Sequence, residues 1–235
     1  MSETEFSHAP RGDGAFTGPL DQETFRALLF SSFLNQQDQL RSRREAERLL
    51  AAIAQTRRAV SEATDLRAAL SLVATSVLEI TGSTGAALAI AAQGEMTCWA
   101  TNGPTAPQLG TPVPLDSGLS GECLRIRRTL RCDDTESDPR VNREACARLG
   151  GVGSMLLVPL LRRNTAIGVL VGFSVRARAF DETDEQLLEL LAVIAAAALS
   201  DFAESEATPR VWQAPTLLPR ALTPLQTGSA SPHLR

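Results

Sequence analysis

Histidine and lysine are the most informative absences in this 235-residue sequence. The only two histidines, His8 and His233, lie near the ends of the chain, in segments that we predict to be tails. All 23 basic residues are arginine. Without an imidazole in the folded part, Ser-His and Cys-His catalytic groups, most zinc sites and histidine-ligated haem are excluded. Without lysine, Schiff-base chemistry and phosphate-loop lysines are excluded as well.

Long apolar runs and a strong charge of one sign are also lacking. The longest apolar run, residues 190–199, is shorter than the roughly 20 residues that a membrane-spanning helix needs. The formal net charge of -4 is spread over mixed signs and gives no basic surface for nucleic acid. Residues 1–5 are acidic and do not have the pattern of a secretory signal. We therefore expect a soluble cytoplasmic protein that binds neither nucleic acid nor membrane.

Cysteine is present, but its spacing excludes a Cys-x-x-Cys zinc or redox motif. The four cysteines are Cys98, Cys123, Cys132 and Cys146. In a reducing compartment they are most simply interpreted as small, buried apolar side chains. A redox-active thiol is the alternative, with Cys123 and Cys132 as candidates. A helix beginning near Gly121 would lower the pKa of Cys123, and the adjacent Arg131 would lower that of Cys132.

The pattern of apolar residues divides the chain into four parts. We predict disordered tails at residues 1–20 and 206–235, the second of them rich in proline. Residues 21–61 have the apolar spacing of an amphipathic helical extension. Its apolar seam either pairs with a second copy as a short coiled coil or packs on its own domain. Residues 62–205 form the predicted domain.

Within this domain, apolar periodicity and turn signals predict alternating helices and strands. Helices are expected from Asp65 to Gly82, over residues 121–128 and 142–149, and from Asp181 onward; strands are expected over residues 86–92, 96–101, 113–115, 153–161 and 166–175. The helix after Gly121 carries three outward arginines, Arg125, Arg127 and Arg128. They form either a solvated face or a surface for an anionic partner.

A set of short motifs follows in a fixed order from residue 65 to residue 203. They are Gly118-Leu119-Ser120-Gly121, Cys132-Asp133-Asp134, Asp138-Pro139-Arg140-Val141, Leu149-Gly150, Val158-Pro159-Leu160, Ile167-Gly168-Val169-Leu170 and Phe180-Asp181-Glu182. This order resembles the GAF domain family, a small sensory module. The resemblance implies an α+β, PAS-related fold with a central antiparallel sheet of about six strands. Helices would cover both faces of the sheet, and long helices would stand at both ends of the domain.

The resemblance also implies a non-catalytic sensory or regulatory role. A small ligand would lie between the sheet and residues 118–149. The candidate pocket residues are Trp99, Asp133, Asp134, Asp138, Arg140 and Cys146. Fixed charges beside an apolar cavity would orient such a ligand. For Asp134 and Asp138 the alternative is structural: their carboxylates cap turns and hold the loop against Arg140.

Comparison with individual branches of the family narrows the choice of ligand and activity. The Asn-Lys pair of cyclic-nucleotide-binding members falls on Ser174-Val175, and no cysteine has the neighbouring histidine that is usual in bilin-binding members. No haem, bilin or zinc is therefore expected. In the free methionine sulfoxide reductase branch, one motif cysteine falls on Ser120 and another lies near Cys146, so a cysteine-dependent reductase is an alternative. A ligand-free dimerisation scaffold is another. We expect a homodimer, formed through the N- and C-terminal helices, that acts on a separate signalling protein.

Overall fold

The computed structural model describes residues 22–92 and 94–205. The predicted tails, both histidines and the hairpin residue Gln93 lie outside these residues. The chain divides into two units, one ending at Glu47 and the other beginning at Arg48. Helix α1 spans this boundary, so the second unit begins before the predicted domain start at residue 62.

In the described residues, helices and strands follow the predicted order. They are α1 (Gln22–Ser61), α2 (Leu66–Thr81), β1 (Gly85–Ala92), β2 (Glu95–Asn102), β3 (Pro112–Val113), α3 (Gly118–Ile126), β4 (Leu130–Cys132), α4 (Arg143–Arg148), β5 (Ser154–Arg162), β6 (Thr165–Ser174) and α5 (Glu182–Ser205). Two details differ from the sequence-based expectation. Helix α3 begins at Gly118 rather than near Gly121, and the short strand β4 was not predicted.

The strands form one antiparallel sheet in the order β3-β2-β1-β6-β5-β4, which confirms the predicted α+β fold. The central pair is β1 with β6, and their register runs from Gly85 opposite Phe173 to Ile90 opposite Gly168. The β5–β6 hairpin turns at Arg163 and Asn164, whose φ angles of 47° and 66° are both positive. This is the backbone geometry of the two-residue turns that match the twist of a hairpin.

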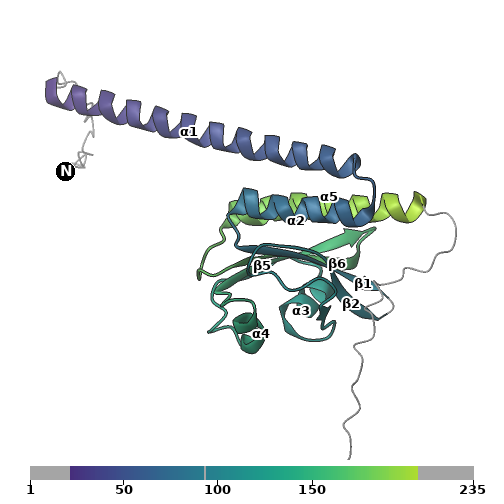
Figure 1. The fold of residues 1–235 in the computed structure, drawn as a ribbon. Coiled ribbons are helices and arrows are strands. Elements are labelled where there is room, and N and C mark those ends of the chain that lie inside the picture. Colours follow the sequence, from purple (N-terminus) through teal and green to yellow (C-terminus); the bar gives the residue numbers. More distant parts are fainter. Residues whose placement is uncertain (1–21, 93, 206–235) are drawn as a thin grey trace, which may run out of the picture. The chain divides into compact units, whose positions relative to one another are not determined.

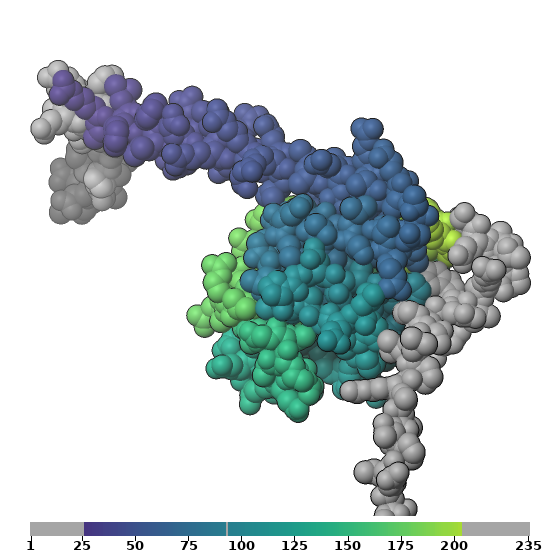
Figure 2. Space-filling model, viewed as in Figure 1, coloured from purple at the N-terminus to yellow at the C-terminus, as the bar shows by residue number. Residues whose placement is uncertain are grey.

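Helices cover both faces of the sheet (Figure 1). On one face α2 and α5 pack over a helix-side cluster, and on the other α3 and α4 pack over a loop-side cluster. The largest fully buried side chains of the helix-side cluster are Leu70, Leu88, Leu156, Leu160, Leu170, Leu188, Leu191 and Leu199. The loop-side cluster includes Met96, Leu119, Cys123, Cys132, Cys146, Met155, Leu157, Val169, Val171 and Phe173. In the space-filling view, α2 (blue) and the α4 segment (green) lie at opposite ends of the second unit (Figure 2).

The two parts of α1 differ in the burial of their apolar side chains. In the first unit, Leu29, Phe33 and Leu40 are exposed. In the second unit, Val60 is buried in the helix-side cluster, and the Thr56 hydroxyl shares a 2.7 Å hydrogen bond with the Ser76 hydroxyl of α2. The end of the predicted apolar seam therefore packs on its own domain.

Helix α2 begins and ends where the sequence places its caps. Asp65 accepts a 2.8 Å hydrogen bond from the Ala68 N–H, and Gly82, with φ of 64°, ends α2.

By length and composition alone, residues 182–203 of α5 could cross a membrane. Leu188, Leu191 and other apolar residues of α5 are nevertheless buried against the sheet, which is the arrangement of a core helix.

Two glycines of β6, Gly168 and Gly172, share a sheet face and differ in the room around them. Because neither residue has a side chain, a neighbouring group can lie close to each of them. A Cβ on Gly168 would lie 2.4 Å from the carbonyl oxygen of Ala89, on the neighbouring strand. A Cβ on Gly172 would lie 3.0 Å from the Ser83 hydroxyl and 3.6 Å from the Phe180 ring.

Substitution of the two glycines should therefore have unequal effects. Gly168→Ala should lower the free energy of unfolding by about 2 kcal/mol, because the strand backbone must move. Gly172→Ala should cost less than about 1 kcal/mol, because a hydroxyl can rotate away. Urea denaturation measures both values. Equal losses of free energy would contradict the greater crowding at Gly168.

Candidate functional site

The polar segment from α3 to α4 covers the loop-side face of the sheet. It contributes Leu119, Cys123, Cys132 and Cys146 to the loop-side cluster. Gly121 lets α3 approach the preceding chain closely, since a Cβ there would lie 2.6 Å from the Leu115 carbonyl oxygen. The motif glycine is thus required by packing.

Three charged side chains hold this segment together, and we call them the Arg140 clamp: Glu122, Asp138 and Arg140. Arg140 Nε donates to Asp138 Oδ1 at 3.0 Å, and Arg140 Nη2 donates to Asp138 Oδ2 at 2.6 Å. Arg140 Nη1 also donates to Glu122 Oε2 of α3 at 3.1 Å. These hydrogen bonds lower the pKa of Asp138 to about 2 and raise the pKa of Arg140 above its ordinary value. The clamp therefore stays charged and joins the loop to α3.

The aspartates of this segment also bond the local backbone. Asp134 Oδ1 accepts from the Glu136 N–H at 3.0 Å, and Asp138 Oδ1 accepts from the Arg140 N–H at 2.9 Å. This confirms the structural interpretation of Asp134 and Asp138 as turn-capping residues. Asp133 instead accepts from Arg131 Nε at 3.0 Å. Direct contact of any of them with a ligand stays a prediction.

The structure separates the candidate pocket residues into two groups. Asp133, Asp134, Asp138 and Arg140 lie in the loop-side segment, and Cys146 is buried in the loop-side cluster. Trp99 instead packs against the helix-side cluster. Cys98, the preceding residue, belongs to the loop-side cluster, and the register shift between Leu88 and Ala89 of β1 falls opposite Trp99 in the strand pair. Trp99 therefore does not lie with the other candidates.

All four cysteines are buried, with free thiols. Burial raises the pKa of Cys98 to about 11, and burial with the nearby Glu122 carboxylate raises the pKa of Cys123 to about 12. Burial, and next the Asp138 charge, raise the pKa of Cys132 to about 11. The pKa of Cys146 is also raised by burial. At neutral pH these groups are thiols rather than thiolates.

The predicted lowering of the pKa at Cys123 and Cys132 is therefore wrong, for two local reasons. Because α3 begins at Gly118, Cys123 lies late in the helix and away from its positive end. The Arg131 guanidinium is occupied by Asp133 and by Glu185 of α5, the latter at 2.7 Å. In the part of the chain that the structure describes, no group of three or more His, Cys, Asp and Glu side chains could hold a metal ion.

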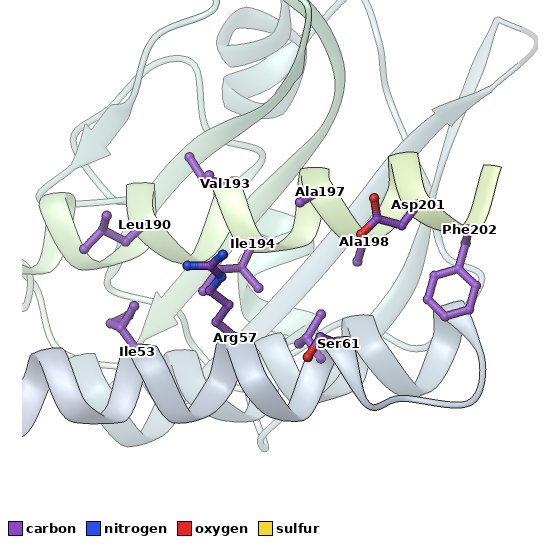
Figure 3. A pocket seen from close by; sticks show the side chains of 11 residues that line it. Ile53, Arg57, Ser61, Leu190, Val193, Ile194, Ala197, Ala198, Asp201 and Phe202 are labelled. Carbon is purple, nitrogen blue, oxygen red and sulfur yellow. The ribbon is translucent and has the colours of Figure 1, made fainter. Parts of the chain in front are cut away.

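Sequence reasoning did not locate the groove between α1 and α5. This groove has a volume of about 680 Å³ and lies within the second unit. Ile53 of α1 points toward Leu190 of α5, and Arg57 extends toward Ile194 (Figure 3). The exposed fractions of Leu190 and Val193 are 42% and 68%. The wide apolar face of α5 was visible in the sequence, but which part of it the sheet leaves uncovered was not.

Comparison with known proteins gives one family and many similar folds. The family model for the GAF domain matches residues 63–200. No curated protein gives a significant match. The GAF domain of a phosphoenolpyruvate-protein phosphotransferase from Coxiella burnetii is 24% identical, with a TM-score of 0.62; the similarity covers 68% of this chain and 96% of that one.

Two further structures have similar folds. Free methionine-R-sulfoxide reductase from Neisseria meningitidis, in complex with its substrate, is 24% identical with a TM-score of 0.59, over 67% of this chain and 91% of that one. A putative GAF sensor protein from Burkholderia vietnamiensis is 23% identical with a TM-score of 0.59, over 68% of this chain and 98% of that one. At these identities, the similarities concern the fold alone.

The Arg140 clamp should stabilise the folded protein at neutral pH and lose this effect in acid. Arg140→Ala should lower the free energy of unfolding at pH 7 by about 1 kcal/mol, since part of the clamp is solvent-screened. Because the pKa of Asp138 falls from 3.8 to about 2 on folding, its stabilisation is complete above about pH 4 and is lost as the pH falls toward 2. Arg140→Ala should remove most of this acid-dependent loss, and the backbone N–H of residue 140 would still bond Asp138.

Arg148→Ala is the matched control for the clamp. Arg148 pairs with Glu144 at 2.8 Å, and their side chains are 66% and 80% exposed, so its removal should change the free energy of unfolding by less than about 0.5 kcal/mol. Denaturant titrations between pH 2 and pH 7 measure both variants. Identical curves for the two variants would contradict a structural role for the clamp.

The native thiols should be nearly unreactive at neutral pH. A chromogenic disulfide reagent should modify the folded protein slowly at pH 7 and all four cysteines rapidly in denaturant, because thiolates are the reactive form. Leu109→Cys, at an exposed loop position, supplies a rapidly reacting control. A native cysteine that reacts as fast as the thiol introduced by Leu109→Cys would overturn the assignment of buried, protonated thiols.

Proposed function

This chain belongs to the GAF domain family, whose members are generally sensory or regulatory domains, and we propose that it is a non-catalytic regulatory module that acts as a homodimer on a separate signalling protein. The observation that carries this proposal is the uncovered apolar face of α5. Leu190, Val193 and Ala197 are exposed in the single chain, although the opposite face of the same helix is buried.

The groove between α1 and α5 gives this face a shape suited to a second helix. Its lining combines the apolar side chains Ile53, Leu190 and Ile194 with one charge of each sign, Arg57 and Asp201. Apolar residues exposed along a groove favour association, because pairing removes their surface from water. The alanine at position 197 would let a partner helix approach closely.

The proposed input is a small ligand on the loop side of the sheet. Asp133, Asp134, Asp138, Arg140 and Cys146 border that region as candidates. Charged groups over an apolar floor supply the orientation and the apolar contact that small-molecule sites combine. The loop-side cluster occupies the face of the sheet, so a ligand would enter by displacing the segment that the Arg140 clamp holds.

A cysteine-dependent reductase is the alternative function, and the chemistry of the thiols argues against it. The fold is similar to that of the Neisseria meningitidis enzyme. However, this chain has Ser120 where the reductase branch of the family has a motif cysteine. Catalysis by cysteine requires a thiolate, whereas burial raises the pKa of all four thiols. Turnover of free methionine sulfoxide with a thiol reductant, lost in Cys146→Ser, would establish the reductase instead.

Native mass spectrometry of the purified full chain tests the proposed function, since it reports the subunit number and any retained small molecule together. We expect a dimer. Leu190→Glu and Ala197→Glu should each raise its dissociation constant at least tenfold, because a buried unpaired carboxylate is costly. Leu109→Glu, at an exposed loop leucine, is the control and should remain dimeric. A monomeric wild type, or variants as dimeric as the control, would contradict the proposal.

A further inference from the structure

Two distant parts of the chain bring four arginines to one corner of the domain. Arg127 and Arg128 follow α3, and Arg162 and Arg163 lie at the β5–β6 turn. Arg127 Nη1 donates a 3.1 Å hydrogen bond to the backbone oxygen of Asn164, which ties the two segments together. We call these four residues the arginine corner.

The arginine corner is not neutralised by the domain itself. Across residues 22–92 and 94–205, no salt bridge involves any of the four, whereas Arg131, Arg140 and Arg148 each pair with a carboxylate. Glu189 of α5, which lines the same hollow as Arg127 and Arg128, accepts a 2.6 Å hydrogen bond from the Thr129 hydroxyl instead. The corner is therefore a concentrated positive charge on a chain whose net charge is -4.

Two of the four arginines stand at strained backbone positions. Arg127 and Arg163 have φ angles of 55° and 47°, in the left-handed region that glycine favours. A side chain at such a position costs about 1 kcal/mol or more. Substitution of Arg127 or Arg163 would therefore change the backbone as well as the charge, so the charge is tested at Arg128 and Arg162.

An open apolar groove adjoins the corner. It has a volume of about 520 Å³ and lies between the end of α3, β5 and α5. Arg127, Arg128, Thr129 and Glu189 supply its polar lining, and its apolar lining consists of Val158, Pro159, Leu161, Ala192 and Val193. A second open hollow of about 640 Å³, further along α5, is lined by Arg162 and Arg163 with Thr165, Ser200 and Ala203. Apolar surface and unpaired positive charge thus run side by side along α5.

We propose that this groove binds a short acidic segment of a partner protein, anchored by an apolar side chain. The anchor would lie on Val158, Pro159 and Leu161, away from the proposed dimer face, and flanking carboxylates would pair with the arginine corner, since a guanidinium matches a carboxylate in geometry and charge. This deepens the proposed regulatory function, on which it rests, by giving the chemistry of the signalling partner.

Other occupants fit the groove less well. A small molecule needs most of its surface enclosed, and this groove is open along one side. A phosphate or a nucleic-acid backbone would gain nothing from the apolar lining of the groove. A segment that alternates acidic and apolar side chains uses both parts of the surface.

Three fluorescein-labelled peptides test the proposal by anisotropy with the full-length protein. They are Glu-Glu-Leu-Leu-Glu-Glu, the same peptide with serine in place of leucine, and Lys-Lys-Leu-Leu-Lys-Lys. We expect the first to bind and the other two to bind at least tenfold more weakly. Equal binding of the serine peptide would identify a general polyanion site and overturn the proposal, as would absence of binding by the first peptide up to 1 mM.

Charge-reversed variants assign the binding to the groove. Arg128→Glu and Arg162→Glu change arginines of the corner that do not have a positive φ angle. Each should weaken binding of the first peptide at least tenfold. Arg67→Glu, on the exposed side of α2, makes the same change of net charge and should leave binding unchanged. Equal weakening by all three variants would indicate a long-range charge effect and would reject the site.

Measurements on the same samples show whether the acidic-segment site or the proposed dimer is wrong. Native mass spectrometry gives the subunit number of each variant. A dimer that persists while the peptides fail to bind rejects the acidic-segment site alone. Peptide binding that persists in a monomeric protein supports the site and rejects the dimer.

Discussion

The structure depends on a sheet whose two central strands are apolar on both faces. Along β6, Val169 and Val171 point to the loop side and Leu170 points to the helix side, and all three are buried. A sheet of this kind must be covered twice, because either face would otherwise expose a large apolar surface. Helices α2 and α5 cover one face, and the polar segment around α3 and α4 covers the other. Each remaining feature follows from how these two covers are held in place.

The two covers are held by different kinds of interaction. On the helix side, leucines of α2 and α5 pack directly on the sheet, so helix formation and burial require the same residues. The loop-side segment has short helices and few leucines, and charged groups close it over the cluster. Arg140 joins Asp138 to Glu122, while aspartate carboxylates satisfy the backbone of the turns. The same closure buries the cysteines, and this explains why a segment rich in polar residues contains unreactive thiols.

Local signals predicted the parts of this fold that local interactions determine. Asp65 and Gly82 bound α2, and the apolar run of residues 166–175 predicted β6. The contacts that were missed join residues far apart in sequence. The 18-residue gap between Glu122 and Arg140, and the 54-residue gap between Arg131 and Glu185, leave no periodic pattern. The pKa of Cys132 was misjudged for this reason: the burial that raises it depends on loop-side contacts between residues far apart in sequence.

Helix α5 belongs to the helix-side cover and is bonded to the loop-side cover, and this gives the proposed input and output a physical connection. Arg131 of β4 donates to Glu185 in the first turns of α5 at 2.7 Å, and the Asp133 backbone oxygen accepts from the Arg178 N–H, just before α5, at 2.7 Å. The loop-side segment is thus bonded to the start of the helix whose outer face carries Leu190 and Val193. Val193 borders both the α1–α5 groove and the groove beside the arginine corner. A ligand that shifted the loop-side segment would change the position of α5, and both outer surfaces would change with it, because a packed helix moves as a rigid element.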